Sequence, residues 1–239
     1  MADVRKDRIT FVVFGPYGNV GLAVSRMIAE YFSASRVTLC SRDSCRLTAL
    51  RRDVFTDSKR VNVMAGDVAE PSVAFDAIHS THNQCELCVV IDASGTWRGV
   101  EEDFSAERVL SYLAPAVRIY EAVCRLTSFL PLHYLYLAGS VAGTVLPFFP
   151  GQFEYSLAKL AMHHCLVSGH ERGVGFTISM ATLGLVEGTD LSKLGPGTRV
   201  TDTLVDPREV AHWALERINN PEGTEWYKTF LGNYQVVVE

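Results

Sequence analysis

Several features are absent from this sequence, and each absence excludes a class of protein. None of its apolar runs reaches the ~20 residues that a membrane-spanning helix needs. The first residues, MADVRKDR, are polar and lack the apolar core of a secretory signal. Acidic residues outnumber basic ones and the net charge is −5, so the composition gives no support for nucleic-acid binding. We therefore expect a cytoplasmic protein with neither membrane nor nucleic-acid partners.

Cysteines are present, but they do not form a metal-binding pattern. Cys85 and Cys88 make a C-x-x-C pair, with neither a second such pair nor nearby histidines to complete a zinc site. Cys88 also begins the apolar run CVVIDA, which is typical of a buried strand. We interpret the pair as inert thiols at a strand end, without a metal, in a protein kept in a reducing compartment.

The chain alternates short β-rich runs with helical patterns and contains no repeat, low-complexity tract or linker. Strands are predicted at 8–15, 35–42, 59–67, 86–95, 132–140 and 175–184, with at least one more in the tail. Helices are predicted at 20–33, 44–55, 71–80, 105–127, 152–173 and 206–220, the last capped by Asp206 and opened by Pro207. The alternation predicts an α/β fold in one domain spanning 1–239. Its core is a doubly wound parallel β-sheet (Rossmann fold) flanked by helices on both faces.

A glycine-rich turn, GPYGNVG at 15–21, separates the first predicted strand from the first predicted helix, as a dinucleotide fingerprint requires. Its glycines suit a tight turn, close approach of the backbone to a pyrophosphate, and close packing of helix on sheet. The helix N-terminus offers unpaired N–H groups to the phosphates. The alternative is a turn whose glycines serve steric needs alone. The predicted cofactor-binding residues here are Gly15, Tyr17, Gly18, Asn19, Val20 and Gly21.

The end of the second predicted strand bears on the choice of cofactor. An acidic residue at this place would bind the adenosine ribose hydroxyls and select NAD(H). The sequence instead has Ser41 and Arg42, whose hydroxyl and guanidinium suit a ribose 2′-phosphate, although Asp43 follows directly. NADP(H) is therefore favoured over NAD(H), with a merely solvated arginine as the alternative.

Tyr155 and Lys159 are four residues apart on one face of a predicted helix, and Ser140 ends the preceding strand. In order, the chain has the glycine-rich turn, then SR, GDV and DASG after the second, third and fourth strands, then GSVAG and YSLAK. This ordered set resembles the short-chain dehydrogenase/reductase family over nearly the whole chain. The resemblance implies reversible hydride transfer between a nicotinamide and a carbonyl or alcohol, with Ser140, Tyr155 and Lys159 as the catalytic residues.

The resemblance also implies a role for each residue. A tyrosine titrates at about 10, so acid–base work near neutral pH needs a neighbouring positive charge, which Lys159 would supply to Tyr155. Ser140 would hydrogen-bond the reacting oxygen, and Lys159 would also bind the nicotinamide ribose. The other cofactor-binding residues that the resemblance implies are Asp67, Val68, Ala93, Ser94, Gly95, Gly184, Val186 and Thr189.

Departures from the family pattern keep other functions open. The G-x-x-G-x-x-G spacing is more typical of the extended and atypical branches, and Asp92-Ala93-Ser94-Gly95 replaces the usual N-N-A-G. Many members carry a catalytic asparagine in the helix after the fourth strand, yet none occurs between 84 and 151, so Ser111 or a neighbour would take its place. The alternatives to a reductase are an isomerase, epimerase or dehydratase on the same fold, and a catalytically silent NADP(H)-binding regulator.

Aromatic residues near the predicted site favour a hydrophobic or aromatic ketone or aldehyde as substrate, with a core or interface role as the alternative. They are Trp97, Phe148, Phe149 and Phe153. A short segment at about 188–205 corresponds to the family's substrate lid. The predicted helices 105–127 and 152–173 correspond to those through which members of the family pair, so a homodimer or homotetramer is expected. The preferred prediction is an NADPH-dependent carbonyl reductase.

Overall fold

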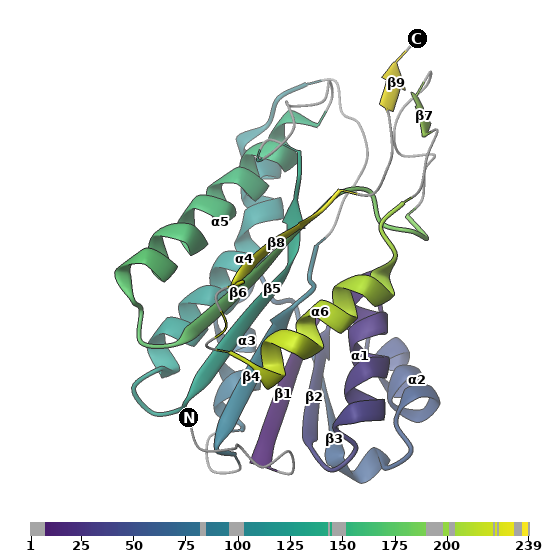
Figure 1. Ribbon diagram of the computed structural model, residues 1–239, viewed down its shortest axis with the longest axis vertical. Coiled ribbons are helices and arrows are strands. Elements are labelled where there is room, and N and C mark those ends of the chain that lie inside the picture. Colours follow the sequence, from purple (N-terminus) through teal and green to yellow (C-terminus); the bar gives the residue numbers. More distant parts are fainter. Residues whose placement is uncertain are drawn as a thin grey trace.

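The structure is a computed structural model that describes residues 8–81, 85–95, 103–142, 144, 152–189, 198–200, 204–221, 223, 225–231 and 236–238. Six helices surround a central sheet (Figure 1). They are α1 (Asn19–Tyr31), α2 (Ser44–Val54), α3 (Pro71–His79), α4 (Ala106–Leu126), α5 (Phe153–Arg172) and α6 (Pro207–Asn219). A short 3₁₀ turn, η2 (Ser58–Arg60), precedes the third strand.

The sheet has seven strands in the order β3-β2-β1-β4-β5-β6-β8, and every pairing between neighbours is parallel. This confirms the predicted doubly wound α/β fold. The strands are β1 (Ile9–Phe14), β2 (Arg36–Ser41), β3 (Val61–Ala65), β4 (Leu87–Asp92), β5 (Leu132–Ser140), β6 (Thr177–Leu183) and β8 (Tyr227–Phe230). The predicted helices and strands up to residue 220 are all present, with ends shifted by a few residues.

Two apolar cores lie on opposite faces of the sheet. Helices α1, α2 and α6 pack on one face, and α3, α4 and α5 on the other (Figure 1). Successive side chains of β1 alternate between them: Phe11 and Val13 belong to the first core, Val12 and Phe14 to the second. A strand buried on both faces reads as a continuous apolar run, which is why ITFVVF carries no polar alternation.

The order of the strands reverses between β1 and β4. The chain proceeds outward from β1 to β2 and β3, then returns to β4 on the other side and continues to β5 and β6. In an open α/β sheet this reversal leaves a crevice outside the carboxyl ends of the two central strands, where ligands bind. The predicted site residues that follow β1 and β4 therefore lie at the place where this topology forms a binding crevice.

Two short strands outside the main sheet pair the predicted lid region with the tail. Strand β7 (Thr198–Val200) is antiparallel to β9 (Val236–Val238), and Figure 1 shows this pair beyond the end of the main sheet. The sequence predicted at least one strand in the tail: β8 joins the main sheet and β9 pairs with β7. The predicted cap of α6 is also present, because the Asp206 side chain accepts a hydrogen bond from the Arg208 N–H.

Candidate functional site

The first turn joins the ends of β1 and β4 through close backbone contact. Gly15 has a φ of +71°, a conformation that favours glycine, and a Cβ there would lie 2.5 Å from the Ala93 carbonyl oxygen after β4. A Cβ on Gly21 would lie 2.1 Å from the Gly15 oxygen. Both positions therefore exclude any side chain. By contrast, a Cβ on Gly18 would be in ordinary van der Waals contact with its nearest neighbour, the Gly15 oxygen at 3.6 Å, so a methyl group fits there.

The N-terminus of α1 faces this turn without a side-chain cap. Gly18 is the N-cap residue, it supplies no side-chain acceptor, and the first turn of α1 holds no acidic residue. The N–H groups of the first turn thus keep their capacity to bind an anion. The side chain of Val20 packs into the core, so this residue has only its backbone to offer a ligand. Asn19 lies next to Gly188, which follows β6.

Three side chains come together at the carboxyl end of β2. The Ser41 hydroxyl donates a hydrogen bond of 2.5 Å to the Tyr17 hydroxyl oxygen, which joins the first turn to β2. The Arg46 guanidinium carbon lies 4.1 Å from the centroid of the Tyr17 ring, within the range of a cation–π contact. Arg42 is exposed at the same end of the strand. Sequence reasoning did not include Arg46, which the first turn of α2 brings back over Tyr17.

Asp43 has a structural task beside this cluster. Its carboxylate accepts a 2.9 Å hydrogen bond from the Arg46 N–H and caps α2. The sequence alone does not decide how Asp43 affects the choice between NADP(H) and NAD(H). One carboxylate oxygen is thus engaged by the helix N-terminus, on a side chain that is exposed to solvent.

A buried carboxylate lies at the carboxyl end of β4. Asp92 is 0% exposed, and its Oδ1 accepts hydrogen bonds from the Ser94 N–H (2.9 Å) and hydroxyl (2.5 Å). The Tyr134 hydroxyl donates to Oδ2 at 3.0 Å. Burial raises the pKa of Asp92, while the bonds from Ser94, the charge of Lys159 and the bond from Tyr134 act in the opposite direction. The predicted cofactor residue Ser94 is therefore also a support for this carboxylate.

Lys159 and Tyr155 lie one helical turn apart near the start of α5. Lys159 is 5% exposed, and its Nζ lies 5.4 Å from the centroid of the Tyr155 ring and 6.0 Å from that of Tyr136. A Cβ placed on Gly95 would be 3.6 Å from the same Nζ. Burial lowers the pKa of Lys159 to about 8, against the opposing effect of Asp92. The structure thus brings together Tyr155, Lys159 and the β4 end.

The ring of Tyr112, on α4, contacts the ring of Tyr155. The two rings are nearly perpendicular, at 87°, with centroids 5.4 Å apart. The hydroxyl of Ser111, the residue that the sequence suggested in place of the missing asparagine, donates to the Arg108 carbonyl oxygen at 2.8 Å. Among the described residues of α4, the neighbour Tyr112 is therefore the one whose ring meets Tyr155.

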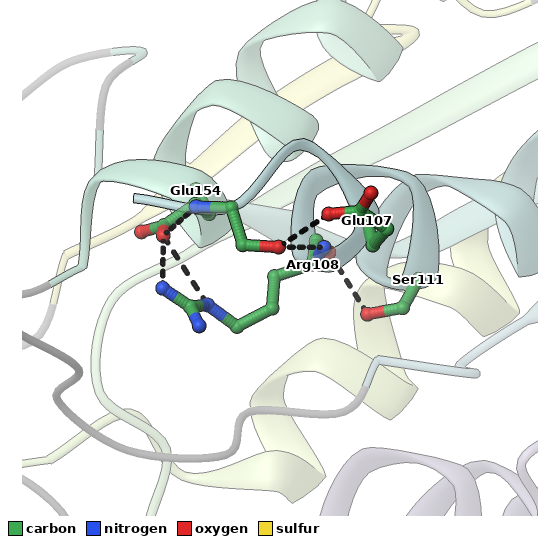
Figure 2. A network of polar contacts seen from close by, with 5 residues as sticks. Glu107, Arg108, Ser111 and Glu154 are labelled. Atoms are coloured by element: carbon green, nitrogen blue, oxygen red, sulfur yellow. Dashed lines mark hydrogen bonds and ion pairs between the residues drawn. The ribbon is translucent and has the colours of Figure 1, made fainter. Parts of the chain in front are cut away.

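A polar network holds the first turn of α5 against the start of α4, as Figure 2 shows. Glu154, directly before Tyr155, accepts hydrogen bonds on Oε1 from Arg108 Nη2 (2.8 Å), Arg108 Nε (3.2 Å) and the Ser105 N–H (3.0 Å). The Ser105 hydroxyl donates to Glu107 and caps α4. The bond from Arg108 lowers the pKa of Glu154. Glu154, the residue before Tyr155, is thus held by the Arg108 guanidinium and the Ser105 N–H at the N-terminus of α4.

The remaining predicted residues lie at or after the carboxyl ends of β3, β5 and β6. Ser140 closes β5, and its Oγ accepts a bond of 3.2 Å from the Ala142 N–H. A serine hydroxyl that accepts one hydrogen bond can still donate another. Asp67 accepts a bond from the Ala69 N–H within its own loop, and Val68 is buried in the core. Gly184, Val186 and Thr189 follow β6 and make backbone hydrogen bonds or bridges.

The predicted substrate residues are only partly described. Trp97, Phe148 and Phe149 lie outside the described residues. Phe153, at the start of α5, is 46% exposed, and its ring meets that of Phe104 with centroids 5.8 Å apart. These two aromatic side chains lie beside the Glu154 network, on the same end of α5 as Tyr155.

The predicted thiol pair differs in burial: Cys88 is buried and Cys85 is half-buried. All six cysteines are free thiols. Cys88 is buried with a pKa raised to about 12, and burial also raises the pKa of Cys85, so neither is a reactive thiolate at neutral pH. The described residues contain no group of three or more histidine, cysteine or acidic side chains that could hold a metal. Nor does any helix in that part of the chain have the length and apolarity to span a membrane.

Comparisons with known proteins identify the family and the fold of this chain. The model of the KR domain family matches residues 10–184. The KRED1-Pglu enzyme superposes with a TM-score of 0.74 at 17% identity, over 92% of this chain and 99% of that one. An alcohol dehydrogenase from the archaeon Thermococcus sibiricus, complexed with 5-hydroxy-NADP, gives 0.71 at 16% identity over 95% and 98%.

A further similar structure is a variant of actinorhodin polyketide ketoreductase with NADPH, with a TM-score of 0.73 and 16% identity over 96% of this chain and 98% of that one. At these identities the superpositions show a shared fold. No curated protein sequence matches the chain. The family model, however, covers most of the chain and includes β1 to β6. The chain therefore belongs to the short-chain dehydrogenase/reductase family, a family of oxidoreductases, with a KR domain over residues 10–184.

Proposed function

We propose that this protein is an NADPH-dependent reductase of a ketone or aldehyde in a hydrophobic or aromatic small molecule, with Tyr155 as the general acid/base. The observation that carries the proposal is the position of Lys159. Its ammonium is buried, 5.4 Å from the centroid of the Tyr155 ring and beside Gly95 at the carboxyl end of β4. A buried positive charge next to a tyrosine favours the phenolate and so prepares the phenol for proton transfer.

The residues around the first turn fit a dinucleotide. The close contacts of Gly15 and Gly21 bring the backbone of the turn against the sheet, Gly18 presents no side chain, and the α1 N-terminus lacks a side-chain cap. Such a turn accepts a pyrophosphate. When bound, a nicotinamide cofactor supplies the hydride. Lys159, which faces the position of a Cβ on Gly95, is the residue that we expect to bind the nicotinamide ribose.

The catalytic roles follow from the donors and acceptors present. In reduction, the Tyr155 hydroxyl gives its proton to the oxygen of the substrate carbonyl, and the Ser140 hydroxyl donates a hydrogen bond to the same oxygen. Lys159 favours the phenolate that remains on Tyr155. The reverse direction, oxidation of the alcohol, uses Tyr155 as the base.

A preference for NADP(H) is supported by two arginines at the end of β2. Arg42 is exposed at that end, and Arg46 lies over the Tyr17 ring, whose hydroxyl is bonded to Ser41. Guanidinium groups bind phosphate oxygens in a fixed geometry. Two of the similar structures hold NADPH or 5-hydroxy-NADP, which also favours this choice.

A homo-oligomer through α4 and α5 is part of the proposal. Leu110 and Val117, seven residues apart on α4, are 62% and 36% exposed, and the exposed Phe104 and Phe153 lie at the same end of the helix pair. Size-exclusion chromatography with light scattering tests this, and Leu110→Glu is expected to shift the protein towards the monomer. The six free thiols support a reducing, cytoplasmic location.

The test of the function is a turnover assay at the nicotinamide absorbance band with NADPH and a panel of aromatic ketones and aldehydes. We expect wild-type turnover, and a loss of about 10²–10⁴-fold in Tyr155→Phe, the range for removal of a general acid. Undiminished turnover in Tyr155→Phe would refute the mechanism. Conversion of a substrate without net oxidation of NADPH would favour the isomerase, epimerase or dehydratase alternative, and NADPH binding without any conversion would favour the silent regulator.

A further inference from the structure

We propose that Asp92 is the internal counter-ion of Lys159 and acts as a positioning residue that holds the ammonium at the carboxyl end of β4. The functional meaning of this inference rests on the proposed function, because it is Tyr155 that Lys159 serves. The pairing itself is a property of the free protein and can be tested without cofactor or substrate.

The hydrogen bonds of Asp92 fit a carboxylate that only accepts. Three donors meet its two oxygens: the Ser94 N–H and hydroxyl on Oδ1, and the Tyr134 hydroxyl on Oδ2. An ionised carboxylate is an acceptor on every side, whereas a protonated one would have to place its own O–H among these three donors. Donors of this kind stabilise the negative charge of a side chain that is 0% exposed.

Lys159, on helix α5, lies near enough to Asp92 for the two charges to interact. Asp92 ends β4 and is paired in register with Tyr136 of β5, and the Nζ of Lys159 lies 6.0 Å from the Tyr136 ring centroid. The same Nζ faces Gly95, three residues after Asp92. The two buried charges, Asp92 on β4 and Lys159 on α5, therefore lie near each other at the carboxyl end of β4. The pKa of each reflects the charge of the other.

The groups that face Lys159 can be assigned element by element. Asp92 comes from β4, Tyr136 from β5 and Tyr155 from α5 itself. The Tyr136 hydroxyl is buried and makes no hydrogen bond with the described residues. In that part of the chain, Asp92 is the carboxylate whose charge acts on Lys159.

A buried ammonium without a counter-charge loses its proton, because desolvation penalises the charged form. Burial already lowers the pKa of Lys159 to about 8, and Asp92 opposes that effect. Lys159 would have to be charged near neutral pH to favour the Tyr155 phenolate. Asp92 thus sustains the charge on which the proposed acid–base role depends, without touching the reacting atoms.

The alternative is that Asp92 only shapes the turn after β4, through its hydrogen bonds with Ser94. The titration of Lys159 distinguishes this structural role from the counter-ion role. The chain has five lysines, so ¹³Cε-lysine NMR gives few signals, and Lys159→Met identifies the signal of Lys159. Asp92→Asn removes the charge but keeps an acceptor for Ser94. We expect it to lower the titration midpoint of Lys159 by about one pH unit, a roughly tenfold change in proton affinity. The matched control Tyr134→Phe keeps the charge and should leave the midpoint in place.

An unchanged Lys159 midpoint in folded Asp92→Asn would overturn the proposal, as would an equal fall in a Tyr134→Phe protein whose Asp92 ¹³Cγ shift is still that of a carboxylate. If Asp92→Asn does not fold, the reciprocal measurement decides: by linkage, Lys159→Met must raise the ¹³Cγ titration midpoint of Asp92. An Asp92 midpoint that stays in place would refute the pairing. Failure of the proposed function is seen separately, since a Tyr155→Phe protein that retains turnover leaves this titration result untouched.

Discussion

The rings of Tyr112 and Tyr155 meet nearly at right angles, with centroids 5.4 Å apart. This contact fixes Tyr155 from α4, while Lys159 lies beside it on α5. Perpendicular aromatic pairs gain about 0.5–1.5 kcal/mol beyond the burial of area. A residue of a different helix therefore contributes to the orientation of the proposed acid/base.

Replacing Tyr112 by leucine should lower kcat/KM for NADPH-dependent reduction by roughly 2- to 10-fold, the equivalent of about 0.5–1.5 kcal/mol. The reason is that the Tyr155 ring loses the contact that orients it. Steady-state kinetics measures the change, with Tyr112→Phe as the control that keeps the ring. If the phenylalanine variant loses as much activity as the leucine variant, the hydroxyl and not the ring is the important part.

Arg46→Ala should weaken NADPH binding by roughly 10- to 100-fold, because a charged hydrogen bond contributes about 1.5–3 kcal/mol. NADH binding should stay unchanged. Fluorescence titration with both cofactors measures the two affinities. Arg42→Ala tests the arginine that the sequence alone suggested, and Arg52→Ala on the exposed side of α2 is the neutral control. Equal losses for NADPH and NADH would remove Arg46 from the specificity site.

The two glycines at the start of α1 should respond differently to alanine. Gly21→Ala puts a Cβ 2.1 Å from a carbonyl oxygen and should cost about 3 kcal/mol of unfolding free energy. Gly18→Ala has space for its methyl and should cost about 1 kcal/mol at most, as an N-cap change. We expect it instead to weaken NADPH binding by roughly tenfold, about 1.4 kcal/mol. Urea unfolding and cofactor titration separate the effects, and normal NADPH affinity in Gly18→Ala would contradict a phosphate beside this residue.

Glu154→Gln should lower Tm by about 2–4 °C at pH 7, corresponding to about 1 kcal/mol, through loss of the charged bond to the partly exposed Arg108. The pKa of Glu154 is lowered by Arg108 in the folded protein. Its contribution to stability is therefore complete above the unfolded-state pKa of about 4.3, and it is lost as the pH falls through the lower folded-state pKa. Thermal scans from pH 7 to pH 3.5 should show the difference between the two proteins shrinking below about pH 4. A difference that persists in acid would show that the carboxylate charge is not its source.

The sheet and its helices could be predicted from the sequence because local patterns determine these elements. Runs that are apolar at nearly every position, such as ITFVVF, identified strands buried on both faces, and Asp206-Pro207 marked the start of α6. The pairing of β7 with β9 could not be predicted, because strands of three residues that lie far apart along the chain have little pattern of their own.

Side-chain placement was predictable only where the backbone fixes it. Arg42 follows β2 directly and was an obvious candidate, whereas Arg46 reaches Tyr17 because of the direction in which α2 begins after the Asp43 cap. Similarly, because no asparagine occurs between 84 and 151, the sequence suggested that Ser111 or a neighbour takes the place of the family's catalytic asparagine. The rotation of α4 against α5, which makes Tyr112 the contacting residue, depends on packing between helices. Asp92 was recognised as a departure from the family motif, but its burial with Tyr134 depends on the register of β4 and β5.

The chain after β6 makes backbone pairings at two places that lie far apart along the sequence. The first is the β-bridge between Val186 and Val205. There the Glu187 N–H donates a hydrogen bond to the Val205 carbonyl oxygen, and the Val205 N–H donates one to the Leu185 carbonyl oxygen. Between these points, β7 is paired with β9. Any displacement of β7 must therefore either break this ladder or carry Val236–Val238 with it. If this region is the substrate lid that the family resemblance implies, its opening requires movement of β9, and we expect removal of β9 to change the rate of product release before it changes the chemistry.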